Sequence, residues 1–493
     1  MNDIRKNIQK KLLTFGKNFK NKHISDLQGP NSFKENIIEN DFLTFDYSKQ
    51  RINEDLLNFL LEIPDLINLR ESLNSLFNGT VRNLSEDKYI SHTLYRNASS
   101  KDNGHISTER RKIKSFLAEM GSSSKFKNLI CLSIGGSRLG PELIYEVQNV
   151  QGPKNVYFCS SNDLLELEDA LRNCHQSETI VFVSSKSFET TEILKNFKYI
   201  KAWFSKVSDV NFENHLYGIS ANAEAMTDLG IKKSHQFVIL DSLVGRFSIW
   251  SSISLPAFIN TDYDSYLQLI EGARIADDHT ENNPWQSNIS VLMALFSIWN
   301  RNSLDINNHG IFTYDFRLRS MTKYIAQLSM ESNGKSVNFS SSMSPFLTTQ
   351  LIWGGYGIEN QHSTFQWLMQ GKTETSCDFI GVKKKAGIFC DSNAILLSQV
   401  LAMTYGREDK ERPYKSVFGN NPCSILQLEY LDLRSLGFLL AIYEHKIFIE
   451  ALVLGIDPFD QWGVQLGKEL SSIAINNKEF LKLYFSKKVL PED

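Results

Sequence analysis

The 493-residue chain contains few cysteines, and none of them form a pair at metal-binding spacing. Its six cysteines are scattered, and no C-x-x-C motif occurs. This pattern argues against a zinc site and a disulfide framework, and it fits a reducing compartment such as the cytoplasm. Because H-x-H motifs and clustered carboxylates are also missing, we expect no metal and no other cofactor.

The chain also lacks a strong charge bias and long apolar segments. Its formal net charge is −3, so no basic surface for nucleic acid is expected. No apolar run approaches the ~18 residues that a membrane helix needs. With 42% hydrophobic residues, the composition is typical of globular proteins, and the length indicates two or three domains.

Residues 1–23 are basic and carry apolar side chains at helical spacing. A transit peptide or a membrane-surface helix would show this pattern. Asp3 is acidic, and both serine and tryptophan are missing from the segment. We therefore favour a helix packed on its own domain. The spaced apolar residues are Ile4, Ile8, Leu12, Phe15 and Phe19.

Short β-branched and aromatic runs alternate with helical segments through the first half of the chain. Buried strands are predicted at 128–134, 156–159, 180–183 and 237–240. The alternation predicts an α/β fold with a parallel sheet covered by helices on both faces. Ligands of such sheets bind beyond the carboxyl ends of the strands.

The alternation returns in the second half and suggests a second α/β domain. Residues 266–340 are mostly helical, and 386–402 predict a strand and a helix. Residues 353–357 contain two adjacent glycines and are predicted as a loop.

Hydroxyls and one ammonium follow the strand 180–183, just before a helix predicted from Glu189. Unpaired N–H groups at a helix start, with such side chains, form a seat for a phosphate dianion. A capping box explains the same hydroxyls, so these residues alone leave both interpretations open. The side chains concerned are Ser185, Lys186, Ser187 and Thr190.

A glycine-rich turn, 135–141, follows the strand 128–134. Ser137 occupies the second glycine position of G-x-G-x-x-G, and no Gly-Lys-Ser/Thr follows, so both nucleotide motifs fail. Two interpretations remain: a purely structural turn, or a turn whose backbone approaches a ligand closely at Gly136 and Ser137. Pro141 suits the first position of the next helix.

Three charged residues give only weak functional signals when each is considered alone. Arg246 follows the strand 237–240 and lies at another carboxyl end. Glu331 is predicted at a helix end beside the Ser332–Gly334 turn, where a glutamate is usually solvated. Lys468 alone is most simply a surface lysine.

Seven motifs, in order from about Asn83 to Lys468, resemble the phosphoglucose isomerase family. The resemblance implies two sugar-isomerase (SIS) domains, each a mainly parallel sheet flanked by helices. We expect a helical region at 1–110, SIS domains at 111–265 and 266–455, and a C-terminal motif and helix at 456–493. The motifs are Ile134–Pro141, Ser185–Glu192, Gly245–Arg246, Met330–Lys335, Gln361–His362, Tyr443–Lys446 and Phe459–Lys468.

The resemblance implies a role for each matching residue. Glu331 would move a proton between C1 and C2 of the sugar, and Arg246 would stabilise the enediolate. His362 and Lys468 would assist ring opening. The remaining positions would bind substrate, chiefly its phosphate: Gly136, Ser137, Ser185, Lys186, Ser187, Thr190, Gln327 and Gln461. It also implies a homodimer in which His362 enters the partner's site.

The chain departs from the family pattern at several positions, but none removes a proposed catalytic group. Val244 replaces the first of two glycines before Arg246, and we expect it to affect turnover rate more than reaction class. The other departures are Thr313, Ala326, Ile358, Glu359 and Asn421.

Three alternative functions are weighed against a phosphoglucose isomerase. A non-catalytic SIS regulator would keep the phosphate loop and lose the base, yet Glu331 is present. A dual phosphoglucose/phosphomannose isomerase would differ only in pocket details. A nucleotide-dependent oxidoreductase is disfavoured by Ser137.

Overall fold

A computed structural model describes most of the chain. The residues described are 2–28, 36–97, 104–148, 152–160, 163–186, 188, 191–383 and 391–476. Within these ranges, none of the helices combines the length and hydropathy that a bilayer crossing requires.

The first sheet has five strands in the order β6-β5-β7-β8-β9, and all its strand pairs are parallel. Its central strands are buried along their whole length, as runs of β-branched and aromatic residues predict. Ser133 pairs with Ser184, so the two predicted ligand loops leave the sheet side by side. The strands are β5 (Asn128–Ser133), β6 (Asn155–Cys159), β7 (Thr179–Ser184), β8 (Leu216–Ser220) and β9 (Gln236–Val238).

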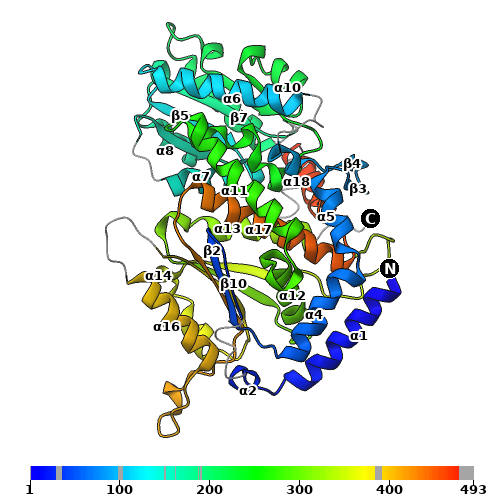
Figure 1. The fold of residues 1–493 in the computed structure, drawn as a ribbon. Helices are drawn as coiled ribbons and strands as arrows, with labels where there is room; N and C mark the ends of the chain where they lie inside the picture. The colour runs from blue at the N-terminus through cyan, green and yellow to red at the C-terminus, as the bar shows by residue number, and fades with distance from the viewer. Residues whose placement is uncertain are drawn as a thin grey trace.

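Helices lie on both faces of this sheet, as α/β connectivity requires (Figure 1). They are α6 (His105–Ser122), α7 (Gly136–Gln148), α8 (Leu165–Leu171), α9 (Thr191–Phe204) and α10 (Ala223–Asp228).

The second sheet has six strands in the order β1-β2-β13-β12-β10-β11. The pairs among its last four strands are parallel, while β2 runs antiparallel to both β1 and β13. The strands are β1 (Ile37–Glu39), β2 (Leu43–Lys49), β10 (Asn308–Thr313), β11 (Leu351–Tyr356), β12 (Ser376–Val382) and β13 (Cys423–Leu428).

Helices lie between the two sheets in Figure 1, and further helices lie elsewhere around the molecule. The central helices are α11 (Tyr263–Asn282), α13 (Met321–Asn333) and α17 (Leu433–Leu454). The others are α1 (Asn2–Phe19), α2 (Ile24–Leu27), α4 (Glu54–Leu66), α5 (Leu69–Phe77), α12 (Ile289–Asn302), α14 (Gly357–Asn360), α15 (Phe365–Gln370), α16 (Ser392–Tyr405) and α18 (Gln465–Asn476).

The basic N-terminal segment forms α1 and packs on the body of the protein, as its apolar spacing predicts. Ile8, Leu12 and Phe19 are buried. Phe19 meets the Trp299 ring edge-on at 5.3 Å, and Phe15 stacks on Phe59 at 5.6 Å between ring centroids.

Two local predictions are wrong. Residues 353–357 belong mostly to strand β11 rather than a loop, because Gly354 and Gly355 adopt φ of 124° and 149°. A Cβ at Gly354 would lie 2.3 Å from the Ile311 carbonyl oxygen, so glycine permits this strand to pair closely.

Helix α7 begins at Gly136, not at Pro141. Its first turn is closed by the Leu139 N–H donating to the Gly135 carbonyl at 2.9 Å. Glycine's weak helix propensity is overridden here by tertiary packing, described below.

Candidate functional site

A cavity of about 760 Å³ lies beyond the carboxyl ends of the first sheet and reaches α13 and α18. Its volume suits a small-molecule ligand. Nine predicted site residues line it: Gly136, Ser137, Ser185, Lys186, Arg246, Gln327, Glu331, Gln461 and Lys468. Side chains from five separate motifs therefore meet in one place.

One wall is the turn that leaves β7. The Ser185 N–H donates to the Ile219 carbonyl at 3.1 Å, and the Ser220 hydroxyl donates to the Lys186 carbonyl at 2.7 Å. These bonds hold the turn against β8. Burial lowers the pKa of the Lys186 ammonium, and the Asp241 carboxylate, 3.8 Å from Nζ, opposes that shift.

A second wall is the start of α7, where glycine is required by close packing. A Cβ at Gly136 would lie 2.2 Å from the Gly245 carbonyl oxygen and 2.7 Å from the Arg246 nitrogen. Gly136 therefore lets α7 touch the backbone that carries Arg246.

Arg246 is 2% exposed and is held by several hydrogen bonds. Nε donates to the Ser332 hydroxyl at 2.7 Å, and Nη1 donates to Gln461 Oε1 at 2.8 Å. Nη2 donates to the carbonyls of Pro458 and Asp460. Burial lowers the pKa of the guanidinium, while Glu331 and Asp460 oppose the shift, so a fixed cation faces the cavity.

Glu331 lies in the last turn of α13, one residue before Ser332. Its Oε1 is 3.5 Å from Arg246 Nη1, and its Oε2 accepts from Gln327 Nε2 at 2.9 Å. Its side chain keeps 28% exposure, so the carboxylate is oriented by both neighbours and still reaches the cavity.

The end of α13 is fixed to α17 and to the segment after it. Asn333 Nδ2 donates to Glu450 Oε2 at 3.1 Å and to the Ile447 carbonyl at 3.0 Å. Lys335 Nζ donates to the Asp457 carbonyl at 2.7 Å and pairs with Asp460. Burial, and then Arg246, lower the pKa of Lys335 to about 8.

Three predicted residues are not placed in the cavity. Ser187 and Thr190 lie outside the described residues. His362 is exposed beyond α14 and is not among the described residues that line the cavity.

Val244 needs no glycine conformation. It has φ −81° and ψ 134°, which any residue adopts, and the next residues carry Arg246 into its bonded position. The backbone at Val244 is therefore unstrained, so backbone strain does not account for the expected effect of Val244 on turnover.

The sequence did not single out several cavity residues, among them Lys88 and Asp241. Asp241 follows the predicted strand 237–240, so its position at a carboxyl end was an available signal. Residues 221–224 follow β8, a strand that the sequence did not predict. Lys88 lies in a hairpin far from Asp241 in the sequence, and only the tertiary structure places it at the cavity wall.

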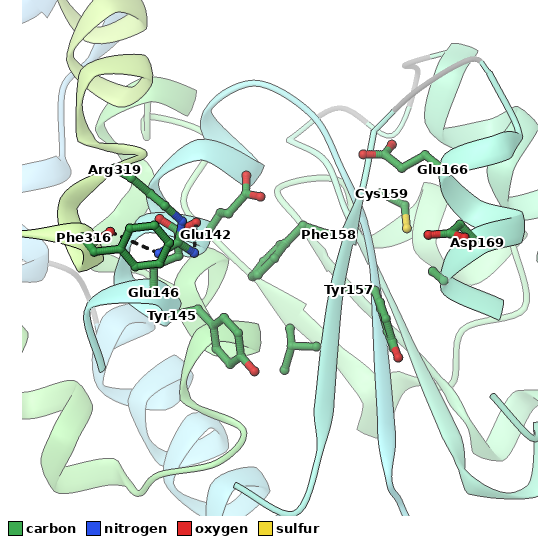
Figure 2. A pocket seen from close by; sticks show the side chains of 12 residues that line it. Glu142, Tyr145, Glu146, Tyr157, Phe158, Cys159, Glu166, Asp169, Phe316 and Arg319 are labelled. Carbon is green, nitrogen blue, oxygen red and sulfur yellow. Dashed lines mark hydrogen bonds and ion pairs between the residues drawn. The ribbon is translucent and has the colours of Figure 1, made fainter. Parts of the chain in front are cut away.

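A second cavity, of about 480 Å³, lies around the edge strand β6 (Figure 2). Its carboxylates are already paired: Glu142 and Glu166 with Arg138, and Glu146 with Arg319 at 2.6 Å. None of the predicted site residues lines it.

Sequence comparisons agree with the motifs. A family model described as phosphoglucose isomerase matches residues 46–482. A glucose-6-phosphate isomerase of Acinetobacter baumannii (strain AYE) is 33% identical, covering 91% of this chain and 89% of that protein. One from Campylobacter jejuni subsp. doylei is 32% identical, covering 92% of each.

The fold agrees as well. A glucose-6-phosphate isomerase of Chlamydia trachomatis superposes with a TM-score of 0.89 at 27% identity, covering 96% of this chain and 98% of that one. A Thermus thermophilus protein of unstated function shares the fold at a TM-score of 0.68 and 19% identity. The chain belongs to the phosphoglucose isomerase family.

Proposed function

We propose that this chain interconverts glucose 6-phosphate and fructose 6-phosphate, with Glu331 as the base and Arg246 as the stabilising cation. The observation that carries the assignment is the pairing of these two groups in one cavity: a partly exposed carboxylate 3.5 Å from a buried, fully bonded guanidinium. A binding module has no need of this combination.

Glu331 takes the proton from C2 of the open-chain aldehyde. The released electron pair forms the C1–C2 double bond of an enediolate, and the negative charge moves to O1. Glu331 then returns the proton to C1, while the proton on O2 passes to O1 and leaves a ketone at C2. One carboxylate serves both half-reactions, because it stays on the same face of the sugar.

Arg246 acts on the charge that develops on oxygen. Its guanidinium is oriented before substrate arrives, by Ser332, Gln461 and the carbonyls of the 458–460 segment. Pre-oriented charge is effective because no rearrangement is needed during the reaction. Gln461 links Arg246 to the cavity wall and is placed to contact the sugar.

The turn after β7 receives the phosphate. Lys186 supplies a positive charge and Ser185 and Ser137 supply hydroxyls in the same cavity. Ser187 and Thr190 belong to the same motif and are assigned to the phosphate by the resemblance. Gly136 brings the backbone at the start of α7 close to the phosphate end of the cavity.

Ring opening needs an acid at the ring oxygen and a base at the anomeric hydroxyl. Lys468, on α18, lines the cavity. Histidine is the residue type suited to acid–base exchange near neutral pH, and the exposed position of His362 suits a homodimer in which it enters the partner's cavity. The five cysteines that the structure describes are free thiols, which fits a cytoplasmic location.

The deciding experiment supplies fructose 6-phosphate and detects glucose 6-phosphate and mannose 6-phosphate separately. Formation of glucose 6-phosphate alone is expected. Formation of both sugars would make the enzyme a dual isomerase. Binding of fructose 6-phosphate without any turnover would make the chain a regulator and would refute the catalytic assignment.

A further inference from the structure

We propose that Lys88 controls the charge at the phosphate end of the cavity by neutralising Asp241, so that Lys186 remains available to the substrate's phosphate. This inference rests on the proposed function and names a positioning residue that neither the motifs nor the comparisons assign.

The geometry is an ion-pair chain along the cavity wall. Lys88 Nζ lies 2.7 Å from Asp241 Oδ2, and Lys186 Nζ lies 3.8 Å from Asp241 Oδ1. Asp241 therefore stands between two ammonium groups, with the closer contact to Lys88. All three residues line the cavity.

The charge balance of the cavity depends on Lys88. Among the described lining residues, the cations are Lys88, Lys186, Arg246 and Lys468, and the anions are Glu224, Asp241 and Glu331. Four cations against three carboxylates leave one net positive charge. Without Lys88 the lining would be neutral, which is a poor match for a phosphate dianion.

A small hairpin delivers Lys88 to this position. It consists of β3 (Arg82–Asn83) and β4 (Lys88–Tyr89). Asn83 Oδ1 accepts the N–H of Ser85 at 3.1 Å, and the Leu84 N–H donates to Asp457 Oδ2 at 3.1 Å. The hairpin is thus tied to the segment that also binds Arg246.

Asp241 would bind Lys186 alone if Lys88 were removed. The phosphate would then have to displace a carboxylate from its main cationic partner. Lys88 and Asp241 are 42% and 61% exposed, so solvent screening limits the effect. We therefore expect a moderate change in binding rather than a loss of catalysis.

The test compares Lys88→Met with wild type at low ionic strength. The KM for fructose 6-phosphate and the inhibition constant of inorganic phosphate should both rise about 3- to 10-fold, with kcat within about 2-fold. The increases should shrink in about 0.5 M salt. Lys127→Met is the matched control. Lys127 Nζ pairs with Glu178 Oε1 at 2.6 Å, and neither residue lines the cavity.

Removal of the carboxylate should reverse the defect. Asp241→Asn alone should lower KM. The double variant Lys88→Met/Asp241→Asn should return KM to within about 2-fold of wild type. Lys88→Arg keeps the positive charge, so its KM should also stay within about 2-fold of wild type. An unchanged KM in Lys88→Met, or a defect that Asp241→Asn does not relieve, overturns the proposal. If wild type does not isomerise, the proposed function fails instead, and phosphate binding still tests the charge role.

Discussion

The two proposed reacting groups, Arg246 and Glu331, are oriented by the protein itself. Arg246 is held by side-chain and carbonyl acceptors, and Glu331 is held by Arg246 and Gln327. In the proposed mechanism, catalysis at the scale of single residues depends on the chemical identity of two side chains more than on any rearrangement.

Glu331→Gln removes the base and keeps the shape. We expect kcat to fall by about 100-fold or more, because general bases typically contribute at least that much. Binding of fructose 6-phosphate, measured by calorimetry, should change little, since the phosphate groups are untouched.

Glu271→Gln, at an exposed position of α11, is a suitable control, because Glu271 pairs only with surface arginines in the described structure. A Glu331→Gln enzyme that keeps more than about a tenth of wild-type turnover would exclude Glu331 as the base.

Two elements meet at the site through Gly136. The start of α7 touches the backbone of η5 (Gly245–Trp250), which carries Arg246. The positions of whole elements, and not only of side chains, therefore set the distance from Arg246 to Glu331.

Gly136→Ala should displace η5, since its Cβ would lie 2.2 Å from a backbone oxygen. We expect kcat to fall about 10-fold or more, because displacements near 1 Å at a catalytic group can cost ~100-fold. Gly121→Ala, in α6, meets no atom within 4 Å and should retain wild-type kcat. Equal kcat values for both variants would contradict the packing role.

Helix α6 is joined to η6 (Ser252–Phe258) through a buried acid. Glu109 accepts the Ser252 N–H at 2.7 Å and the Tyr95 hydroxyl at 3.0 Å. Burial raises the pKa of Glu109 from 4.5 to about 7, although these hydrogen bonds oppose the shift.

This shift predicts a pH dependence of stability. Between pH 4.5 and about 7 the unfolded chain loses the Glu109 proton while the folded chain keeps it. The contribution of Glu109 to the free energy of unfolding is therefore fully present below pH 4.5. It is lost as the pH rises to about 7, by at most about 3 kcal/mol.

Glu109→Gln has no such proton, so chemical denaturation of both proteins across this pH range isolates the effect. Wild type should lose stability relative to the variant as pH rises. A difference that is constant with pH would refute the raised pKa.

Four strands of the first sheet, β5, β6, β7 and β9, followed from short apolar runs, whereas β8 and the described strands of the second sheet were not predicted individually. Two further differences have local causes. The two glycines of β11 led to a loop prediction, and the glycines at the start of α7 led to a helix start placed too late, at Pro141. In both places close backbone contact favours glycine, and propensity alone reads it as a break.

On the scale of the whole molecule, α17 binds both of the elements that carry Arg246 and Glu331, η5 and α13. Glu444, on this helix, accepts from Trp250 Nε1 at 3.0 Å and from Arg96, and Glu450 binds the end of α13. The division of the chain at 110, 265 and 455 remains a prediction, and β1 and β2 show that N-terminal residues complete the second sheet.

The proposed shared site predicts complementation between two inactive variants. Glu331→Gln and His362→Ala should each be inactive as homodimers. A mixed dimer has one site with both changes and one with neither. Random assortment makes about half the dimers mixed, so roughly a quarter of wild-type activity should return after co-refolding.

Mass spectrometry of differently tagged subunits should establish that mixed dimers form. If they form and activity does not return, His362 acts within its own chain and the shared-site proposal is wrong.

The sequence by itself determined the α/β class, the family and the residue types of the reaction, because short motifs and strand periodicity are local properties. Nine of the twelve predicted residues line one cavity. Only the tertiary structure decided that Arg246 and Glu331 face each other and that Lys88 shares Asp241 with Lys186. These are contacts between distant segments, and their distances depend on how helices and sheets pack.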